Sequence, residues 1–445
     1  MVNALMRQVS EWMGGRGGFI LMPGDHAVQL DLIGKVRGWA AAESYFDALC
    51  EENKNMKTYG ALLNCYVREL LVEKALCHMQ KMKDLGFVST ALTYNCIMSL
   101  YTKSGQHEKV PSMLAEMKED KVLPDNLSYS ICINSYGTRS DLDGMERLLE
   151  EMECQPHITV DWNTYALVAS IFIKAGIPDK AVIALKKAEW KLLGKRGSEG
   201  YNYLISLYSS LGKTMDVLRI LKLQKAACRR LYNSDYTNML GSLMKLEEFE
   251  EAEALLKEWV GSGNCYDFRV PNVVLKCYCQ KGLVEKAKAL LEEITKMGKS
   301  PVPDTYGIMA AGYAGRDDLG KAVEFMKLAF SVVPRNEVWK PNPKLVMKIL
   351  NWFREEENIE EAEAFVVLLS AATGISEEKY HAVIKADAKA EIEFGMIHSR
   401  VTVDTTDVDG DAAKTVSSHE DDKYLMSWAG GLIIRMVMKA FDDRD

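Results

Sequence analysis

The fold is decided by the stretch Ala91–Asp125, which reads ALTYNCIMSLYTKSGQHEKVPSMLAEMKEDKVLPD. In its first half, Tyr94, Ile97 and Tyr101 follow the i, i+3, i+7 spacing of one apolar helix face. Gly105 ends this helix, because glycine enters the left-handed conformation easily. A second helix follows, with apolar positions at Val110, Met113, Leu114 and Met117. The stretch therefore predicts a helical hairpin of 35 residues.

The same unit recurs along the chain with a period near 35 residues. Its fourth position is tyrosine in seven of nine consecutive units, although tyrosine makes up only 19 of 445 residues. The eleventh position is aromatic in eight of the nine units, and the twentieth is small or apolar in all of them. One hairpin cannot bury its own apolar face, so neighbouring hairpins must stack around a continuous core. The sequence thus predicts an all-α superhelical solenoid of helix-turn-helix repeats.

The domain organisation follows from where this pattern holds. Residues 1–55 carry truncated repeat elements, and because they open on a second helix we expect an incomplete start. Nine hairpins fill residues 56–376, and residues 377–398 form a degenerate C-terminal helical segment. Residues 399–423 are acidic without a helical period, which is typical of a disordered linker. Residues 424–445 are apolar but too short and too charged to predict a membrane span.

The charge distribution bears on the choice of partners. The formal net charge is −8, which by itself argues against a nucleic-acid ligand. However, residues 56–376 hold 41 basic and 41 acidic side chains, so the array is neutral and most of the acid excess lies after residue 376.

The cysteines and histidines give no sign of catalytic or metal chemistry. Most of the ten cysteines occupy helix positions otherwise held by small apolar residues, so we expect free thiols in the core and no metal site. The sequence has no phosphate loop, metal-ligand spacing or nucleophile motif. We therefore expect neither an enzyme nor a bound cofactor.

These units resemble the pentatricopeptide repeat. The resemblance lies in T-Y-N near the start, Gly at position 15, Ala at 20, Met at 27 and Pro-Asp at the end, and it is closest to the P-type class. The tetratricopeptide repeat would need W-L-G-Y and A-F-P columns, which are missing. The resemblance implies a right-handed superhelical α-solenoid of about 35-residue repeats. KTYGALLNCYVRE and DWNTYALVASIFIKAG are similar to a plant subgroup that is mostly mitochondrial.

The resemblance also implies single-stranded RNA as the partner, with one base read per unit, chiefly by the fifth and last positions. By the family's rules the pair Asn95/Asp125 looks like a uracil reader. The pairs Ser130/Asp161 and Thr237/Asp267 look like guanine readers, whereas Asn202 and Asn272 offer an amide but fit less well.

Two further columns complete the implied interface. At position 2, only Leu92 and Leu127 supply the apolar side chains that would sandwich a base. Position 13 carries basic residues expected on the concave side, where they would contact phosphates or, alternatively, remain solvated: Arg68, Lys103, Lys174 and Lys245.

Two functions stay open. The first is RNA binding with weak sequence specificity in organellar transcript processing, stability or translation. The second is a scaffold of an organellar ribonucleoprotein or ribosome, acting mainly through protein contacts. We expect the protein to be located in the mitochondrion, with the chloroplast or the cytoplasm as alternatives. We expect it to bind neither a membrane nor a small-molecule substrate.

Overall fold

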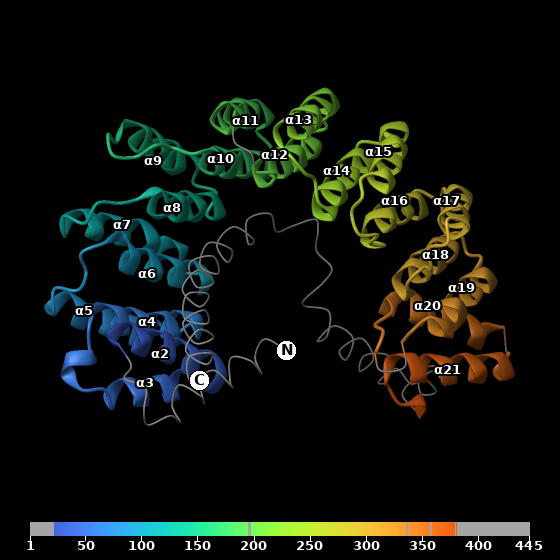
Figure 1. The fold of residues 1–445 in the computed structure, drawn as a ribbon, viewed down its shortest axis with the longest axis horizontal. Helices are drawn as coiled ribbons and strands as arrows, with labels where there is room; N and C mark the ends of the chain where they lie inside the picture. The colour runs from blue at the N-terminus through green and yellow to red at the C-terminus, as the bar shows by residue number, and fades with distance from the viewer. Residues whose placement is uncertain (1–21, 195–196, 335–336, 357, 379, 381–445) are drawn as a thin grey trace, which may run out of the picture. The chain divides into compact units, whose positions relative to one another are not determined.

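The computed structural model describes residues 22–194, 197–334, 337–356, 358–378 and 380. Within these residues the chain forms helices and no strands, in two compact units, Met1–Leu193 and Gly194–Asp445 (Figure 1). The predicted all-α class is confirmed. The predictions for residues 399–423 and 424–445, for most of 377–398 and for the first 21 residues lie outside the described part of the chain.

The first unit begins with a short hairpin of α2 (Pro23–Arg37) and α3 (Trp39–Asp47), which packs on α4. Four full hairpins follow, and their first helices pack directly on one another in order along the chain. Figure 1 shows these first helices as one layer and the second helices as another. The first helices are α4 (Met56–Arg68), α6 (Ala91–Lys103), α8 (Asn126–Thr138) and α10 (Trp162–Lys174). The second helices are α5 (Val72–Asp84), α7 (Val110–Glu119), α9 (Leu142–Cys154) and α11 (Pro178–Leu192).

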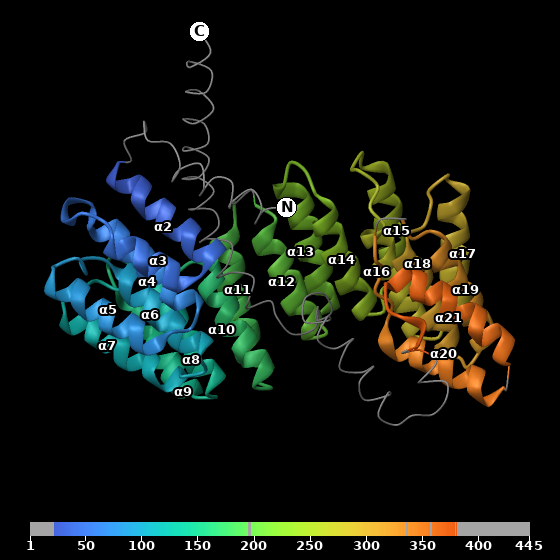
Figure 2. The same cartoon turned by 90° about the horizontal axis from the view of Figure 1, so that it is seen from below.

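The second unit has the same construction over five hairpins. Its first helices again pack on one another from repeat to repeat, and Figure 2 shows them side by side in chain order. They are α12 (Glu199–Ser210), α14 (Asn233–Lys245), α16 (Arg269–Gln280), α18 (Pro303–Gly315) and α20 (Pro343–Glu355). The second helices are α13 (Thr214–Ala227), α15 (Phe249–Gly261), α17 (Val284–Lys296), α19 (Leu319–Ser331) and α21 (Ile359–Thr373). Each unit is therefore a solenoid of stacked hairpins.

The turn inside each hairpin has one residue with a left-handed backbone. Gly105 has φ 75°, and the backbone N–H of Gln106 donates to the Tyr101 carbonyl at 2.8 Å, which closes the end of α6. The fifteenth position is left-handed in the eight hairpins whose turns are described, yet only half of these residues are glycine. The non-glycine residues are Leu70, Ser140, Glu247 and Asp317, with φ between 55° and 63°.

The repeated apolar columns form the core. Tyr94, Ile97 and Val110 of the template unit are fully buried. The twentieth position is at most 2% exposed in all nine repeats, because it lies where the two helices of a hairpin come closest. These columns are therefore packing positions.

The cysteines depart in part from the sequence expectation. All ten are free thiols, and Cys65, Cys132 and Cys228 are buried as expected. The expectation of a core position was wrong for four others, which lie in loops or on outward-facing helix positions and are exposed: Cys50, Cys77, Cys154 and Cys265.

Candidate nucleic-acid interface

The last residue of several repeats caps the first helix of the next repeat. Asp125 is the N-cap of α8, and its Oδ1 accepts the backbone N–H of Ser128 at 2.8 Å. Asp161 caps α10 in the same way, accepting from the N–H of Thr164 at 2.9 Å. A carboxylate in this place satisfies a helix N–H that has no partner within the helix. Helix capping therefore positions the last-position carboxylates beside the preceding repeat.

The pair Asn95/Asp125 is brought together by direct contact. The Asn95 Nδ2 donates to Asp125 Oδ1 at 3.0 Å, and the Ser128 Oγ donates to Asn95 Oδ1 at 2.7 Å. A carboxylate can only accept, so the amide nitrogen must face Asp125 and the amide oxygen must face Ser128. Asn95 is only 3% exposed, and beyond these two contacts one Nδ2 hydrogen and one lone pair of Oδ1 remain for a further partner.

Two leucines flank this network. Leu92 precedes Asn95 by three residues on α6, and Leu127 holds the corresponding position of α8, the helix packed against it. Leu92 is 64% exposed and Leu127 43% exposed, so both side chains present apolar surface to the solvent. The arrangement offers two apolar surfaces and one fixed polar donor.

The pair Ser130/Asp161 is joined through a third residue. The Thr164 Oγ1 donates to Asp161 Oδ1 at 3.0 Å and lies 3.4 Å from the Ser130 Oγ. Ser130 is half-buried, so its hydroxyl keeps some access to solvent.

The amides of Asn202 and Asn272 contact the following repeat. Asn202 Nδ2 donates to Asp235 Oδ1 at 2.7 Å, and its Oδ1 accepts from Gln224 Nε2 at 2.9 Å. Asn272 Oδ1 accepts from the Thr305 hydroxyl at 2.9 Å. In both repeats the contact comes from the third residue of the next repeat rather than from the last residue of the same repeat.

This third position was missed in the sequence reasoning. Ser128, Thr164, Asp235 and Thr305 hold it in four repeats, and each approaches the fifth-position side chain of the preceding repeat. The signal was visible as the residue directly before the tyrosine column, which is threonine or serine in five of nine units.

The pair Thr237/Asp267 has other contacts. The Thr237 hydroxyl donates to the backbone oxygen of Asn233 at 2.8 Å. Asp267 lies one residue before the N-cap of α16 and accepts from the Arg269 side chain at 2.6 Å. This hydrogen bond with Arg269 lowers the pKa of Asp267 below its usual value. Asp267 is therefore bound by Arg269, the first residue of α16, the helix that directly follows it.

The four basic candidates divide into two groups. Arg68 lies 3.3 Å from Asp31, and Lys245 Nζ lies 3.4 Å from the Ser210 hydroxyl. Lys103 and Lys174 are exposed at the last residue of α6 and α10, where a positive charge is favoured by the helix dipole. Lys245 is likewise exposed at the last residue of α14, so among these four candidates Arg68 alone is paired with a carboxylate of the described residues.

In the part of the chain that the structure describes, no group of three or more His, Cys, Asp or Glu side chains could hold a metal ion. No helix among the described residues has the length and apolar character that crossing a membrane requires.

A solenoid of helical hairpins with a row of polar side chains along its first helices defines the class of helical-repeat binding proteins. A family model described as PPR repeat matches residues 57–87, 127–155, 234–264 and 270–298, and a second model, described as PPR repeat family, matches residues 89–138. A mitochondrial pentatricopeptide repeat-containing protein of Arabidopsis thaliana is 49% identical over 382 residues, which cover 86% of this chain and 77% of that protein. The chain therefore belongs to the pentatricopeptide repeat family.

Other relatives agree with this assignment. A second mitochondrial pentatricopeptide repeat-containing protein of Arabidopsis thaliana is 33% identical over 369 residues, covering 83% of this chain and 75% of that protein. The large ribosomal subunit protein mL101 (rPPR4) of the same plant is 35% identical over 400 residues, which cover 89% of this chain and 81% of that protein. The predicted family and the mitochondrial location are confirmed, whereas the P-type class stays a prediction.

Solved structures support the fold. The crystal structure of the pentatricopeptide repeat protein PPR10 in complex with an 18-nt psaJ RNA element matches with a TM-score of 0.51 and 18% identity. The match covers 83% of this chain and 57% of that longer chain. The predicted α-solenoid is confirmed.

Proposed function

We propose that the chain binds single-stranded mitochondrial RNA along the first helices of its repeats. It acts in transcript processing, stability or translation, and it does so by binding rather than by catalysis. The observation that carries this proposal is the network of Asn95, Asp125 and Ser128 between the exposed side chains of Leu92 and Leu127. PPR10, which shares the fold, is seen in complex with an RNA element.

The network accounts for a preference for uracil. A base inserted between Leu92 and Leu127 stacks on two apolar surfaces, and the remaining Nδ2 hydrogen of Asn95 donates to it. Uracil presents carbonyl oxygens that accept this hydrogen and a ring N–H that can donate to the free lone pair of Asn95 Oδ1, whereas adenine and cytosine have no ring N–H on their pairing edge. Four of the eight other repeats lack such a constellation, since their fifth position has no hydrogen-bonding side chain: Gly60, Ala166, Gly307 and Met347. We therefore propose weak sequence specificity overall.

The assignment of uracil to the pair Asn95/Asp125 is tested by a variant that changes the preferred base and keeps Asp125 as the N-cap of α8. Asn95→Ser converts the pair Asn95/Asp125 into the serine and aspartate combination found at Ser130/Asp161. We expect the preferred base at one position of a short RNA to change from uracil to guanine, with about 1–3 kcal/mol of discrimination for a good polar contact. The measurement is fluorescence anisotropy with four oligonucleotides that differ only at that position. An unchanged preference contradicts the assignment, and a misfolded variant cannot imitate a gain of guanine binding.

Phosphate contact is tested by the salt dependence of binding. We expect Lys103→Gln to reduce the slope of log K against log salt by about one, because one phosphate contact is lost. Lys118→Gln is the matched control: Lys118 lies on a second helix and pairs with Glu151 at 2.5 Å. Equal slopes for the wild type and the Lys103 variant would remove this residue from the interface.

A second candidate function is a structural role in a mitochondrial ribonucleoprotein. It is favoured by the 35% identity to a protein named as a large ribosomal subunit component. The two functions separate on a density gradient of mitochondrial extract containing the tagged full chain. Sedimentation with the large ribosomal subunit supports the structural role, and sedimentation with a defined transcript in lighter fractions supports the first function.

A further inference from the structure

The fourth-position tyrosines link neighbouring second helices. The Tyr129 hydroxyl donates to Glu151 of α9 at 2.7 Å, and the Lys118 Nζ of α7 lies 2.5 Å from the same carboxylate oxygen. Lys118 also lies 5.7 Å from the centre of the Tyr129 ring. The sixth repeat repeats this arrangement, with the Tyr236 hydroxyl and the Lys225 ammonium both on Glu258, at 3.5 Å and 2.5 Å. A ring, a carboxylate and an ammonium thus close the space between successive second helices.

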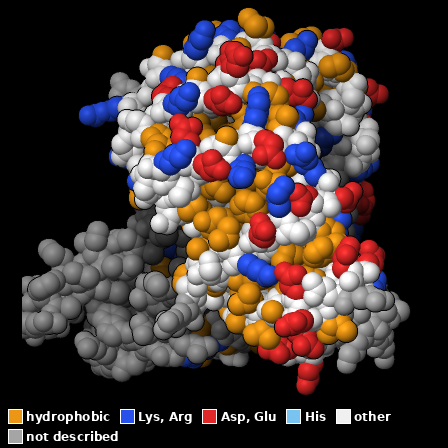
Figure 3. Space-filling view, turned by 90° about the vertical axis from the view of Figure 1, so that its right-hand side faces the viewer, with side chains coloured by type: hydrophobic (Ala, Val, Ile, Leu, Met, Phe, Trp, Pro, Cys, Tyr) orange, Lys and Arg blue, Asp and Glu red, His pale blue; other side chains and the backbone are white. Residues whose placement is uncertain are grey.

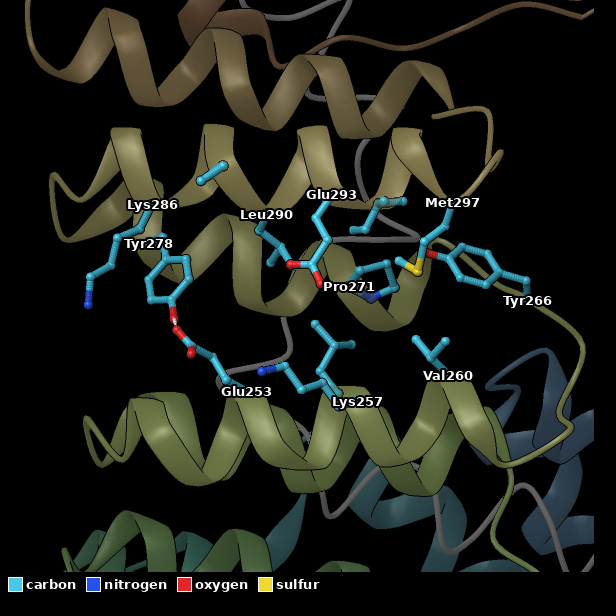
Figure 4. Close-up of a pocket in the computed structure, with 13 residues that line it drawn as sticks. Glu253, Lys257, Val260, Tyr266, Pro271, Tyr278, Lys286, Leu290, Glu293 and Met297 are labelled. Atoms are coloured by element: carbon cyan, nitrogen blue, oxygen red, sulfur yellow. Dashed lines mark hydrogen bonds between the residues drawn. The ribbon is translucent and has the colours of Figure 1, made fainter.

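The seventh repeat lacks two of these three groups. Pro271 stands in place of the tyrosine, and Val260 stands in place of the lysine. The carboxylate remains, because Glu293 holds the position of Glu151 and Glu258. Here the structure has a pocket of about 500 Å³ between α15 and α17. Figure 4 shows Pro271 and Glu293 directed into it. We call this space the tyrosine slot.

A missing tyrosine is filled differently in the ninth repeat, where Val346 holds the fourth position. Phe330, at the position equivalent to Val260, packs on Phe365 with ring centres 5.4 Å apart. Phe365 in turn lies 5.5 Å from Phe353. In the seventh repeat Tyr266 and Tyr278 line the slot, but no ring takes the place of the fourth-position tyrosine.

The polar groups of the slot match a phenol on a polypeptide. Glu293 can accept a hydroxyl hydrogen, as Glu151 does from Tyr129. The Tyr266 hydroxyl, whose end points toward Met297 and the slot in Figure 4, is buried and has no hydrogen-bond partner among the described residues. Burial raises the pKa of Tyr266 to about 12, so this hydroxyl stays protonated at neutral pH and can donate to a peptide carbonyl.

The surroundings favour a protein partner. The rim residues Val260 and Met297 are 44% and 45% exposed. Lys257 and Lys286 are balanced by Glu253 and Glu293, so the lining carries no excess of positive charge that would attract a phosphate. Hydrophobic side chains lie exposed among charged ones on the side that carries α17, α19 and α21, as Figure 3 shows. Tyrosine anchors in such pockets are common at the centres of protein interfaces.

We propose that the tyrosine slot binds a tyrosine side chain presented by a segment of a partner protein. The ring takes the place that Tyr129 and Tyr236 fill in their own repeats, and its hydroxyl donates to Glu293. The slot is lined mainly by the second helices α15 and α17, together with Pro271 and Tyr278 of the first helix α16.

The proposal is tested with random twelve-residue peptides displayed on phage and selected on the purified full chain. We expect the selected peptides to share a tyrosine, and its replacement by phenylalanine in the synthetic peptide to weaken binding about tenfold, as loss of a hydrogen bond to a charged group does. Glu293→Gln should weaken binding to a similar degree. Glu258→Gln, the same change in the neighbouring repeat that has its own tyrosine, should leave binding unchanged.

A second variant fills the slot. Pro271→Tyr restores the ring that the other repeats carry, so we expect a higher Tm and at least about a tenfold loss of peptide affinity. Circular dichroism and thermal unfolding report whether this variant folds. If it does not fold, the comparison of Glu293→Gln with Glu258→Gln tests the proposal. The proposal is overturned if the peptides share no tyrosine or bind Pro271→Tyr as well as wild type. It is also overturned if 4-ethylphenol alone binds as tightly as the peptides, since the slot is then a small-molecule site.

Discussion

The left-handed turn residue of each hairpin makes a quantitative prediction at Gly105 and Ser140. These residues hold the same position in successive repeats, with φ values of 75° and 59°. A Cβ added to Gly105 would meet no heavy atom within 4 Å, and Ser140 is exposed. Exchanging the two residue types therefore changes the backbone energy and leaves the packing almost untouched.

We expect Gly105→Ser to lower the free energy of unfolding and Ser140→Gly to raise it, each by about 0.5–1 kcal/mol. A left-handed backbone costs a residue with a Cβ roughly 1–2 kcal/mol. The greater freedom of glycine in the unfolded chain offsets about 0.4–1 kcal/mol of that cost. A difference of about 1 kcal/mol corresponds to a Tm shift of about 2–4 °C for 150–250 residues.

The assay is thermal unfolding followed by circular dichroism on the two single variants and on the double exchange. The shifts of Gly105→Ser and Ser140→Gly should have opposite signs and nearly cancel in the double variant, because the two side chains do not touch. If both single variants unfold at lower temperature than the wild type, the turn conformation does not control stability and the reasoning is refuted.

Two further predictions concern buried groups. The His78 ring lies 3.0 Å from the Tyr59 carbonyl, and burial lowers the pKa of His78 below its ordinary value of 6.5. The unfolded chain therefore takes up the proton first, and stability falls as the pH drops below about 6.5. We expect the Tm of His78→Gln to fall less between pH 7.5 and 5.5 than that of the wild type. A Cβ at Gly137 would lie 2.5 Å from Ile171, so Gly137→Ala should cost about 1–3 kcal/mol in chemical denaturation. Gly60→Ala, which meets no atom within 4 Å, should instead stabilise the chain by about 0.5–1 kcal/mol, and equal losses for both variants would contradict the contact.

The packing columns and the recognition columns differ in how well they persist along the chain. The twentieth position is buried in every repeat, since a polar side chain there would lose its contact with water between the two helices of a hairpin. The fifth position has no such constraint, and it ranges from Asn95 to Ala166 and Gly307. A solenoid can therefore keep its fold while most repeats lose the groups that read a base.

The proposed tyrosine slot extends this contrast to the second helices. Tyr129 and Tyr236 serve the packing of their own repeats, and the loss of the ring at Pro271 converts a packing position into an exposed pocket. Two replacements in a repeat array, at Pro271 and Val260, can thus open a pocket beside the second helices.

The sequence alone determined the hairpins, their period and their turns. These features depend on the spacing of apolar residues within about ten positions and on local backbone preferences, both of which are readable along the chain. Tyr94, Ile97 and Val110 were predicted as core residues and are fully buried. The contact of Asn95 with Asp125 joins two residues that the family resemblance had already paired.

Only the tertiary structure decided which side chains meet across repeats. Asn202 contacts Asp235, and Ser128 completes the Asn95 network. Such contacts depend on helix capping and on the exact approach of residues about 30 positions apart, where a shift of one ångström exchanges one partner for another. The space beside Pro271 became visible for the same reason, because a pocket is defined by several helices at once and by no single stretch of sequence.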